Sequence, residues 1–134
     1  MTQRQEGNRS PETDDSSEVP TVLVVDDEPD ALWAMVQSVM AAGYRVCSAS
    51  CAGAALELIR RNSDIEILYT DVLMPRMDGV TLARRALELN PNIRVLLVSG
   101  SPDAVADLHG GEPGEFAFLM KPVSPSEVAY ALGR

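Results

Sequence analysis

The sequence predicts an α/β fold with a doubly wound, five-stranded parallel sheet and helices on both faces. Short apolar runs alternate strictly with segments of helical spacing, and this alternation is typical of a parallel sheet. Three of the runs are nearly continuous in β-branched residues and leucine, as expected of strands covered on both faces. The five expected strands are residues 22–25, 44–49, 65–70, 93–98 and 116–120. The second of them has the weakest pattern, which places it nearer an edge of the sheet.

The helical segments follow the strands in chain order. In the first, apolar residues recur at helical spacing from Leu32 to Val39, with Pro29 near the start and Gly43 just past the end. The second segment carries Leu56 and Ile59. These two segments are therefore expected to pack one face each against the sheet.

The later helices differ in how clearly they are marked. The third carries Leu82, Ala86 and Leu89 and stops before Pro91. The last begins with Ser-Pro-Ser-Glu at residues 124–127, which is a capping box with proline at the first helical position. Between the fourth and fifth strands the pattern is weak, because residues 103–108 allow two turns before a segment rich in glycine and proline.

The length of 134 residues fits one domain. Residues 1–19 are expected to form a disordered acidic and polar tail, because their most acidic stretch has no apolar side chains to bury. Residues 20–134 are expected to form the domain. The start of the chain is polar and has no apolar signal segment, and no apolar run is long enough to span a membrane. We therefore expect a cytoplasmic protein.

The composition excludes several classes of function. The chain has 11 basic and 20 acidic residues and a net charge of −9, which argues against direct binding to nucleic acid or to an anionic membrane. Cys47 and Cys51 do not form a C-x-x-C motif, and His109 is far from them in the chain. Both cysteines are expected to be reduced thiols of a cytosolic protein.

Polar side chains stand where the expected strands end. Asp26 and Asp27 follow the first strand, Asp71 the third, Ser99 the fourth and Lys121 the fifth. Ligands of open parallel sheets bind beyond the carboxyl ends of the strands, so these side chains are expected to gather there. Adjacent carboxylates repel and need a cation, and Mg²⁺ suits oxygen ligands and phosphoryl groups. The pattern predicts a phosphoryl-transfer site with Asp71 as nucleophile, Lys121 as a second cation and Ser99 as a hydrogen-bond donor.

Four motifs in chain order make the sequence resemble the receiver domain of two-component response regulators. They are Val-Val-Asp-Asp-Glu at residues 24–28, Thr-Asp-Val-Leu-Met-Pro-Arg-Met-Asp-Gly at 70–79, Val-Ser-Gly at 98–100 and Leu-Met-Lys-Pro at 119–122. Each lies at the end of an expected strand, and together they are highly specific. The resemblance covers residues 21–134 and implies the flavodoxin-like strand order 2-1-3-4-5.

The resemblance also implies a metal site and a phosphoacceptor. Asp71 matches the phosphoacceptor. Asp26 and Asp27 match the acid pair that holds Mg²⁺, with Mn²⁺ as the alternative ion, and Asp27 matches the direct ligand of the two. Asp71 itself and the backbone carbonyl of Leu73 would complete the set of metal ligands from the protein.

Three more positions match residues that respond to the phosphoryl group. Ser99 matches the switch hydroxyl, Lys121 the lysine that contacts the phosphoryl group, and Phe118 the switch aromatic. Ordinary core packing is an equally open role for Phe118. In this family the Lys121–Pro122 peptide bond is usually cis.

The function implied by the resemblance is phosphorelay signal transduction. A sensor or hybrid histidine kinase, or a histidine phosphotransfer protein, would donate a phosphoryl group to Asp71 and change the surface presented to an unknown downstream protein. Such a domain is a self-phosphorylating and autodephosphorylating switch rather than a turnover enzyme.

Two alternatives stay open at this point. The first is a receiver-like interaction module that is never phosphorylated. Such a module would be expected to lack an acid, the acceptor or the lysine, all of which are present here. The second is a phosphatase or phosphotransferase with an aspartyl intermediate, which usually carries a second acid two residues after the nucleophile, where this sequence has Leu73. A nucleotide-binding domain is disfavoured because no glycine-rich loop follows the first strand.

Overall fold

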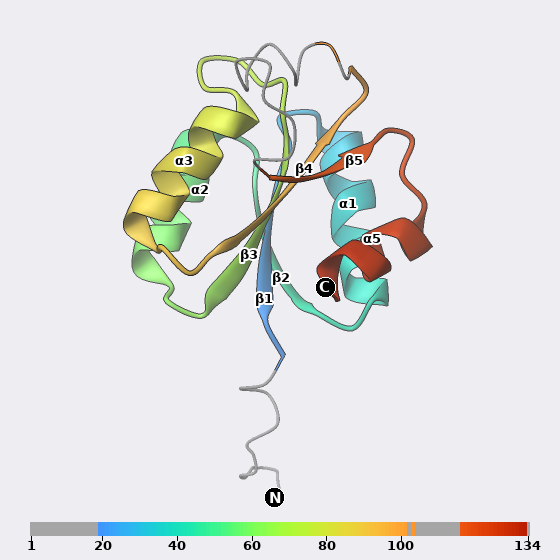
Figure 1. Cartoon of the computed structure of the whole chain (residues 1–134), viewed down its shortest axis with the longest axis horizontal. Helices are drawn as coiled ribbons and strands as arrows, with labels where there is room; N and C mark the ends of the chain where they lie inside the picture. Colours follow the sequence, from blue (N-terminus) through green and yellow to red (C-terminus); the bar gives the residue numbers. More distant parts are fainter. Residues whose placement is uncertain (1–18, 102, 104–115, 134) are drawn as a thin grey trace, which may run out of the picture.

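The computed structural model describes residues 19–101, 103 and 116–133 and has the predicted α/β architecture (Figure 1). Five parallel strands form one sheet in the order β2-β1-β3-β4-β5, as the resemblance implied. The strands are β1 Thr21–Val25, β2 Arg45–Ala49, β3 Ile65–Asp71, β4 Arg94–Ser99 and β5 Ala117–Met120. The helices are α1 Pro29–Ala41, α2 Ala52–Arg61, α3 Gly79–Leu89 and α5 Pro125–Leu132.

Helices cover both faces of the sheet. In Figure 1, α2 and α3 lie on one side of the strands, and α1 and α5 lie on the other. Along β1, Leu23 and Val25 face the α2–α3 side, whereas Val22 and Val24 face the α1–α5 side, and all four are fully buried. Burial on both faces explains why the run is apolar throughout instead of alternating. Each such side chain contributes roughly 1.5–3 kcal/mol of transfer free energy.

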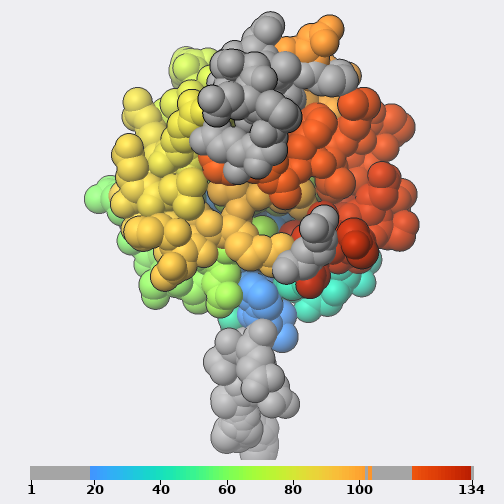
Figure 2. All heavy atoms as spheres, in the orientation of Figure 1, coloured from blue at the N-terminus to red at the C-terminus, as the bar shows by residue number. Residues whose placement is uncertain are grey.

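The weak second strand lies at one edge of the sheet, as its pattern predicted. Arg45 and Ser48 in β2 are exposed, and β2 pairs only with β1. The opposite edge is β5, which pairs only with β4 and is shown from its outer side in Figure 2. The site described below lies between these edges, at the carboxyl ends of β1 and β3.

The helices begin where side chains cap them. The capping box of α5 is present, since Ser124 Oγ accepts a hydrogen bond from Glu127 N–H at 3.1 Å and Glu127 Oε1 accepts one from Ser124 N–H at 2.9 Å. Asp78 caps α3 by accepting a hydrogen bond from Thr81 N–H at 2.8 Å. These caps fix the starts of the helices that follow β3 and β5.

Several predictions fall outside the described residues or concern single residues. The weak helix expected at residues 103–108 lies outside them except for Asp103, and the tail expected at residues 1–19 lies outside them except for Val19. Cys47 and Cys51 are free thiols, half-buried and exposed respectively. No helix in the part of the chain that the structure describes is long and apolar enough to cross a bilayer.

Candidate functional site

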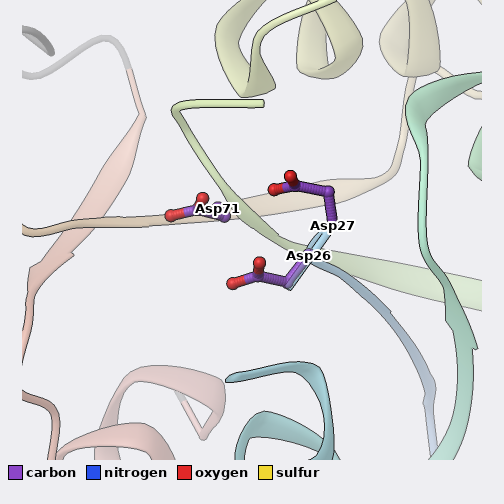
Figure 3. Close-up of side chains that lie close together, drawn as sticks. All are labelled: Asp26, Asp27 and Asp71. Carbon is purple, nitrogen blue, oxygen red and sulfur yellow. The ribbon is translucent and has the colours of Figure 1, made fainter. Parts of the chain in front are cut away.

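Three carboxylates converge at the carboxyl end of the sheet (Figure 3). Asp26 and Asp27 follow β1, and Asp71 is the last residue of β3, which is the neighbour of β1 in the sheet. The two strands are parallel and pair in register up to Val25 and Thr70, so their ends lie side by side. One oxygen of each of the three carboxylates lies within 4.8 Å of the other two.

Asp26 is buried, with 1% of its surface exposed. Its Oδ1 accepts a hydrogen bond from Glu28 N–H at 2.9 Å. Its Oδ2 is also buried and receives no hydrogen bond, although the Lys121 ammonium lies 3.5 Å away, at ion-pair distance. A buried carboxylate oxygen without a hydrogen bond is unfavourable unless a cation interacts with it. This oxygen therefore has the chemistry of a cation ligand.

Glu28, the third acid after β1, serves the helix instead of the site. Its Oε1 accepts a hydrogen bond from Ala31 N–H at 2.6 Å and caps α1 at the residue before Pro29. Asp27, in contrast, is exposed and its carboxylate belongs to the group of three. The acid run after β1 thus divides into two side chains in the site and one helix cap, a division that the sequence alone did not reveal.

Asp71 has an environment suited to a nucleophilic carboxylate. It is 8% exposed, and its Oδ1 lies 3.2 Å from Lys121 Nζ. Burial, and then the negative charge of Asp26, raise the pKa of the Asp71 carboxyl above its ordinary value, against the opposing effect of Lys121. A raised pKa makes the carboxylate oxygen more basic, and groups perturbed in this way are common at functional sites.

Lys121 supplies the positive charge opposite the acids. Burial lowers the pKa of its ammonium, but the charges of Asp71 and Asp26 outweigh burial, and the pKa stands above its ordinary value. Its backbone N–H donates to the Ser99 carbonyl at 2.9 Å, which ties the end of β5 to the end of β4. The Lys121–Pro122 peptide bond is cis, as expected from the resemblance.

Ser99 lies at the end of the strand next to Asp71, and Leu73 follows Asp71 by two residues in the chain. Ser99 is 1% exposed at the end of β4, one residue beyond Val98, which pairs with Asp71. Its Oγ accepts a hydrogen bond from Ser101 N–H at 3.1 Å, which uses the oxygen and not the hydroxyl proton. Leu73 lies in the loop after Asp71 and is 51% exposed.

Phe118 has the packing role that the sequence left open. It pairs with Leu97 across β4 and β5 and packs, partly buried, against the cluster of Val72, Val80 and Leu97. This cluster joins the segment that follows Asp71 to the edge strand. The structure thus shows Phe118 in contact with the neighbourhood of the acceptor.

Gly79, the last residue of the motif at 70–79, packs directly against the Asp71 backbone, a contact that the sequence did not indicate. A Cβ at Gly79 would lie 2.2 Å from the Asp71 carbonyl oxygen and 2.9 Å from Val72 Cα. Gly79 N–H donates to the Val72 carbonyl at 2.7 Å, and Thr70 Oγ1 donates to the Asp71 carbonyl at 2.9 Å. Only glycine allows α3 to approach the end of β3 this closely, because every other residue has a Cβ.

The donor set fits a hard divalent cation. Three carboxylates lie together, one of them has a buried oxygen without a hydrogen bond, and all the ligand atoms are oxygen. Mg²⁺ takes one or two carboxylates and keeps several waters, whereas zinc prefers nitrogen and sulfur. The three acids of this site could therefore hold a divalent metal ion.

The chain resembles known proteins over nearly its whole domain. The family model described as the response regulator receiver domain matches residues 22–132. The chain is 34% identical over 110 residues to the sensor kinase CckA of Brucella abortus (strain 2308). This match covers 81% of this chain and 12% of that kinase. The chain is also 30% identical over 101 residues to the response regulator receiver protein CpdR of the same organism, and this match covers 75% of this chain and 83% of CpdR.

A solved structure gives the same result. The crystal structure of a response regulator receiver domain protein from Clostridium thermocellum matches with a TM-score of 0.77 at 26% identity, and the match covers 86% of this chain and 92% of that one. The chain spans 12% of the length of CckA but corresponds to most of CpdR, so the shared unit is the receiver domain itself. Because the family model covers nearly all of the described residues, this chain belongs to the response regulator receiver domain family and is a receiver of two-component phosphorelays.

Proposed function

We propose that this chain accepts a phosphoryl group on the carboxylate of Asp71 from the phosphohistidine of a sensor kinase, a hybrid histidine kinase or a histidine phosphotransfer protein. One observation carries the proposal. The Lys121 ammonium lies 3.2 Å from Asp71 and 3.5 Å from Asp26, two of the three carboxylates that lie together. Phosphoryl transfer needs positive charge next to an anionic nucleophile, and Lys121 supplies that charge at Asp71.

In the transfer step, a carboxylate oxygen of Asp71 attacks phosphorus in line with the bond to the histidine nitrogen. The new oxygen–phosphorus bond forms as the nitrogen–phosphorus bond breaks, and the electron pair of the broken bond stays on the imidazole. The pKa of Asp71 is raised by burial and by Asp26, so its oxygen is a better nucleophile than an exposed carboxylate. The Lys121 ammonium lies where it can offset negative charge on the phosphoryl oxygens.

The proposed metal is Mg²⁺, with Mn²⁺ as the alternative ion. Asp26, Asp27, Asp71 and the backbone carbonyl of Leu73 would hold it. When bound, the ion would neutralise charge shared between the carboxylates and the phosphoryl oxygens. The buried Oδ2 of Asp26, which receives no hydrogen bond, supports this assignment.

Two residues would carry the response to phosphorylation. Ser99 would donate its hydroxyl proton to a phosphoryl oxygen, since its present bond from Ser101 uses only the oxygen. A shift of Ser99 would free space for Phe118, which is partly buried on the neighbouring strand β5. The changed surface would be recognised by a downstream protein, and hydrolysis of the aspartyl phosphate would reset it. The chain would thus act as a switch and not as a turnover enzyme, in the cytoplasm, where free cysteines such as Cys47 and Cys51 stay reduced.

Intact mass spectrometry tests the proposal. The protein is incubated with Mg²⁺ and phosphoramidate, and the wild type is expected to gain one phosphoryl group. Asp71→Asn should gain none, because an amide is a poor nucleophile. Asp64→Asn is the matched control, since Asp64 is an exposed acid just before β3, at the opposite end of the strand from Asp71. Equal labelling of Asp71→Asn and the wild type would show that Asp71 is not the acceptor. Absence of labelling in the wild type would favour the interaction module.

A further inference from the structure

Arg76 has a backbone conformation that residues with a Cβ rarely adopt. Its φ is 70°, and among the residues that the structure describes the other positive φ belongs to Gly43, at 95°. Glycine occupies this region without steric cost, whereas a Cβ approaches the following carbonyl oxygen. The chain thus uses glycine at one of these two positions and a charged residue at the other.

A tight turn holds Arg76 in this conformation. Met77 N–H donates to the Pro75 carbonyl at 2.7 Å, a bond that spans a single residue. An i→i+2 bond around a central residue of positive φ is a γ-turn of the rare, strained kind. Strained backbone persists where the surrounding structure enforces it, and it is concentrated at functional sites. The turn is therefore a reason to ask what the arginine does there.

The turn lies on the loop that leaves the acceptor. This loop, residues 72–78, starts directly after Asp71 and rises above α3 at the carboxyl end of the sheet (Figure 1). Its ends are joined by the bond from Gly79 N–H to the Val72 carbonyl, at 2.7 Å. Five extended residues span at most about 17 Å, and this loop folds back, so Arg76 lies closer to Asp71 than that limit, and roughly 10 Å serves as the separation for the charge argument below.

The charge of Arg76 is opposite to that of the site. Without a metal ion, three carboxylates and one ammonium leave the site with excess negative charge, and the whole chain carries −9. Every phosphodonor is an anion, so a positive charge near the site attracts it whether or not a metal ion is bound. The Arg76 side chain is exposed, and within the described ranges it makes no ion pair.

Resting on the proposed function, we infer that Arg76 is a specificity-determining residue that attracts anionic phosphodonors to the Asp71 site. It acts through space, as a positive charge on the loop that leaves Asp71, and this attraction does not require the metal site to be empty. The strained turn keeps its backbone at the carboxyl end of the sheet. The attraction should scale with the negative charge of the donor and fall with ionic strength.

The experiment compares two small donors of different charge, acetyl phosphate, which is doubly charged near neutral pH, and phosphoramidate, which is singly charged. Phosphorylation is followed by intact mass over time with Mg²⁺ at low ionic strength. For one unit charge at about 10 Å in water, Arg76→Asn should lower the second-order rate constant about 4-fold for acetyl phosphate and about 2-fold for phosphoramidate. Arg76→Lys should keep most of the rate, and high salt should abolish the difference.

Two controls separate this role from others. Arg61→Asn removes the same charge from the end of α2, just before β3, at the far end of the sheet, and should leave both rates unchanged. Arg76→Gly should slow phosphorylation like Arg76→Asn while raising the denaturation midpoint, because it relieves the turn, so slower reaction would not reflect unfolding.

The results distinguish failure of this inference from failure of the proposed function. If Asp71→Asn is unlabelled but Arg76→Asn reacts like the wild type with both donors at low salt, the inference is wrong and the proposed function stands. The inference is also wrong if Arg76→Asn lowers the phosphorylation rate equally for both donors and at any salt concentration. It is wrong as well if Arg61→Asn lowers the rate as much as Arg76→Asn does. Labelling of Asp71→Asn at the wild-type rate would overturn the proposed function itself.

Discussion

The ends of β3 and β5 carry the opposite charges of one site, but the fold supports them differently. β3 has seven residues, pairs with strands on both sides, and exposes only Glu66. β5 has four residues, lies at an edge, and has no buried residue. The Asp71 side chain is accordingly 11% exposed, whereas the Lys121 side chain is 38% exposed. Packing fixes the acceptor, whereas a few individual contacts hold the cation.

These contacts can be identified on each side. At the β3 end, Gly79 lets α3 close on the Asp71 carbonyl. At the β5 end, the backbone bond from Lys121 to Ser99 holds the lysine, and Arg94 on β4 holds the helix that follows. The difference teaches that close packing of the backbone holds Asp71 in position, whereas individual hydrogen bonds hold Lys121 in position. Substitutions at the two ends should therefore differ in size and in kind.

The largest effect is expected at the β3 end, from Gly79→Ala. The added Cβ would overlap the Asp71 carbonyl oxygen at 2.2 Å, and the contact is with backbone that cannot rotate away. We expect the free energy of unfolding to fall by about 3 kcal/mol, as for overpacked cores. Urea denaturation measures it.

Gly53→Ala is the matched control for that substitution. Gly53 lies in α2, and a Cβ there would meet nothing within 4 Å. Alanine should therefore raise the free energy of unfolding by about 0.5–1 kcal/mol, because it restricts the unfolded chain and favours helix. If Gly79→Ala were as stable as the wild type, the close approach that distinguishes the β3 end would be wrong.

Removing the charge that links the two ends should have an intermediate effect. The folded-state pKa of Asp71 is raised above its unfolded value by burial and by Asp26, so the folded protein binds a proton more tightly than the unfolded chain between the two values. Wild-type stability without metal therefore falls as pH rises through this window. In Asp71→Asn no buried carboxylate has to be charged, so this variant should be more stable than the wild type at pH 7 by roughly 1–2 kcal/mol.

The pH dependence gives this prediction its sign. The stability gap between Asp71→Asn and the wild type should close as pH falls below the ordinary pKa of an aspartate, where the wild type is protonated in both states. Added Mg²⁺ should narrow the gap at pH 7, because a ligand of the folded state stabilises it. Asp64→Asn, an exposed acid, should change stability little. A mutant less stable than the wild type at pH 7 would contradict the raised pKa.

The sequence predicted the two ends unequally. Apolar runs buried on both faces located β1 and β3 within one residue, and polar residues at their ends identified the three acids, because strand period and chain order are local signals. The close approach of Gly79 and the division of labour between Glu28 and Asp27 were missed, since each depends on where two segments meet in space. Glutamate is not a preferred helix cap, so residue type gave no signal for Glu28.

The smallest effect concerns the support of the β5 end. Arg94, at the start of β4, donates from its guanidinium to the Leu132 carbonyl at 2.9 Å and to the Ala131 carbonyl at 3.0 Å, and the start of β4 lies beside the end of α5 (Figure 2). The last turn of α5 contains no basic residue, so Arg94 provides the positive charge that its carbonyls attract. Arg94→Ala should lower the free energy of unfolding by about 1 kcal/mol.

Arg94→Lys should recover only part of that loss, because an ammonium does not match the fork geometry of the guanidinium. Arg60→Ala is the control, since Arg60 pairs with Glu57 on the surface of α2, and exposed pairs contribute about 0.5 kcal/mol or less. Hydrogen exchange locates the effect. In Arg94→Ala the amides at the end of α5 should exchange faster, while those of β3 keep their protection relative to global unfolding. If β3 lost protection as much as α5 did, Arg94 would support the whole sheet and not only α5. The contrast between the closely packed β3 end and the β5 end, which individual contacts hold, would then not apply to α5.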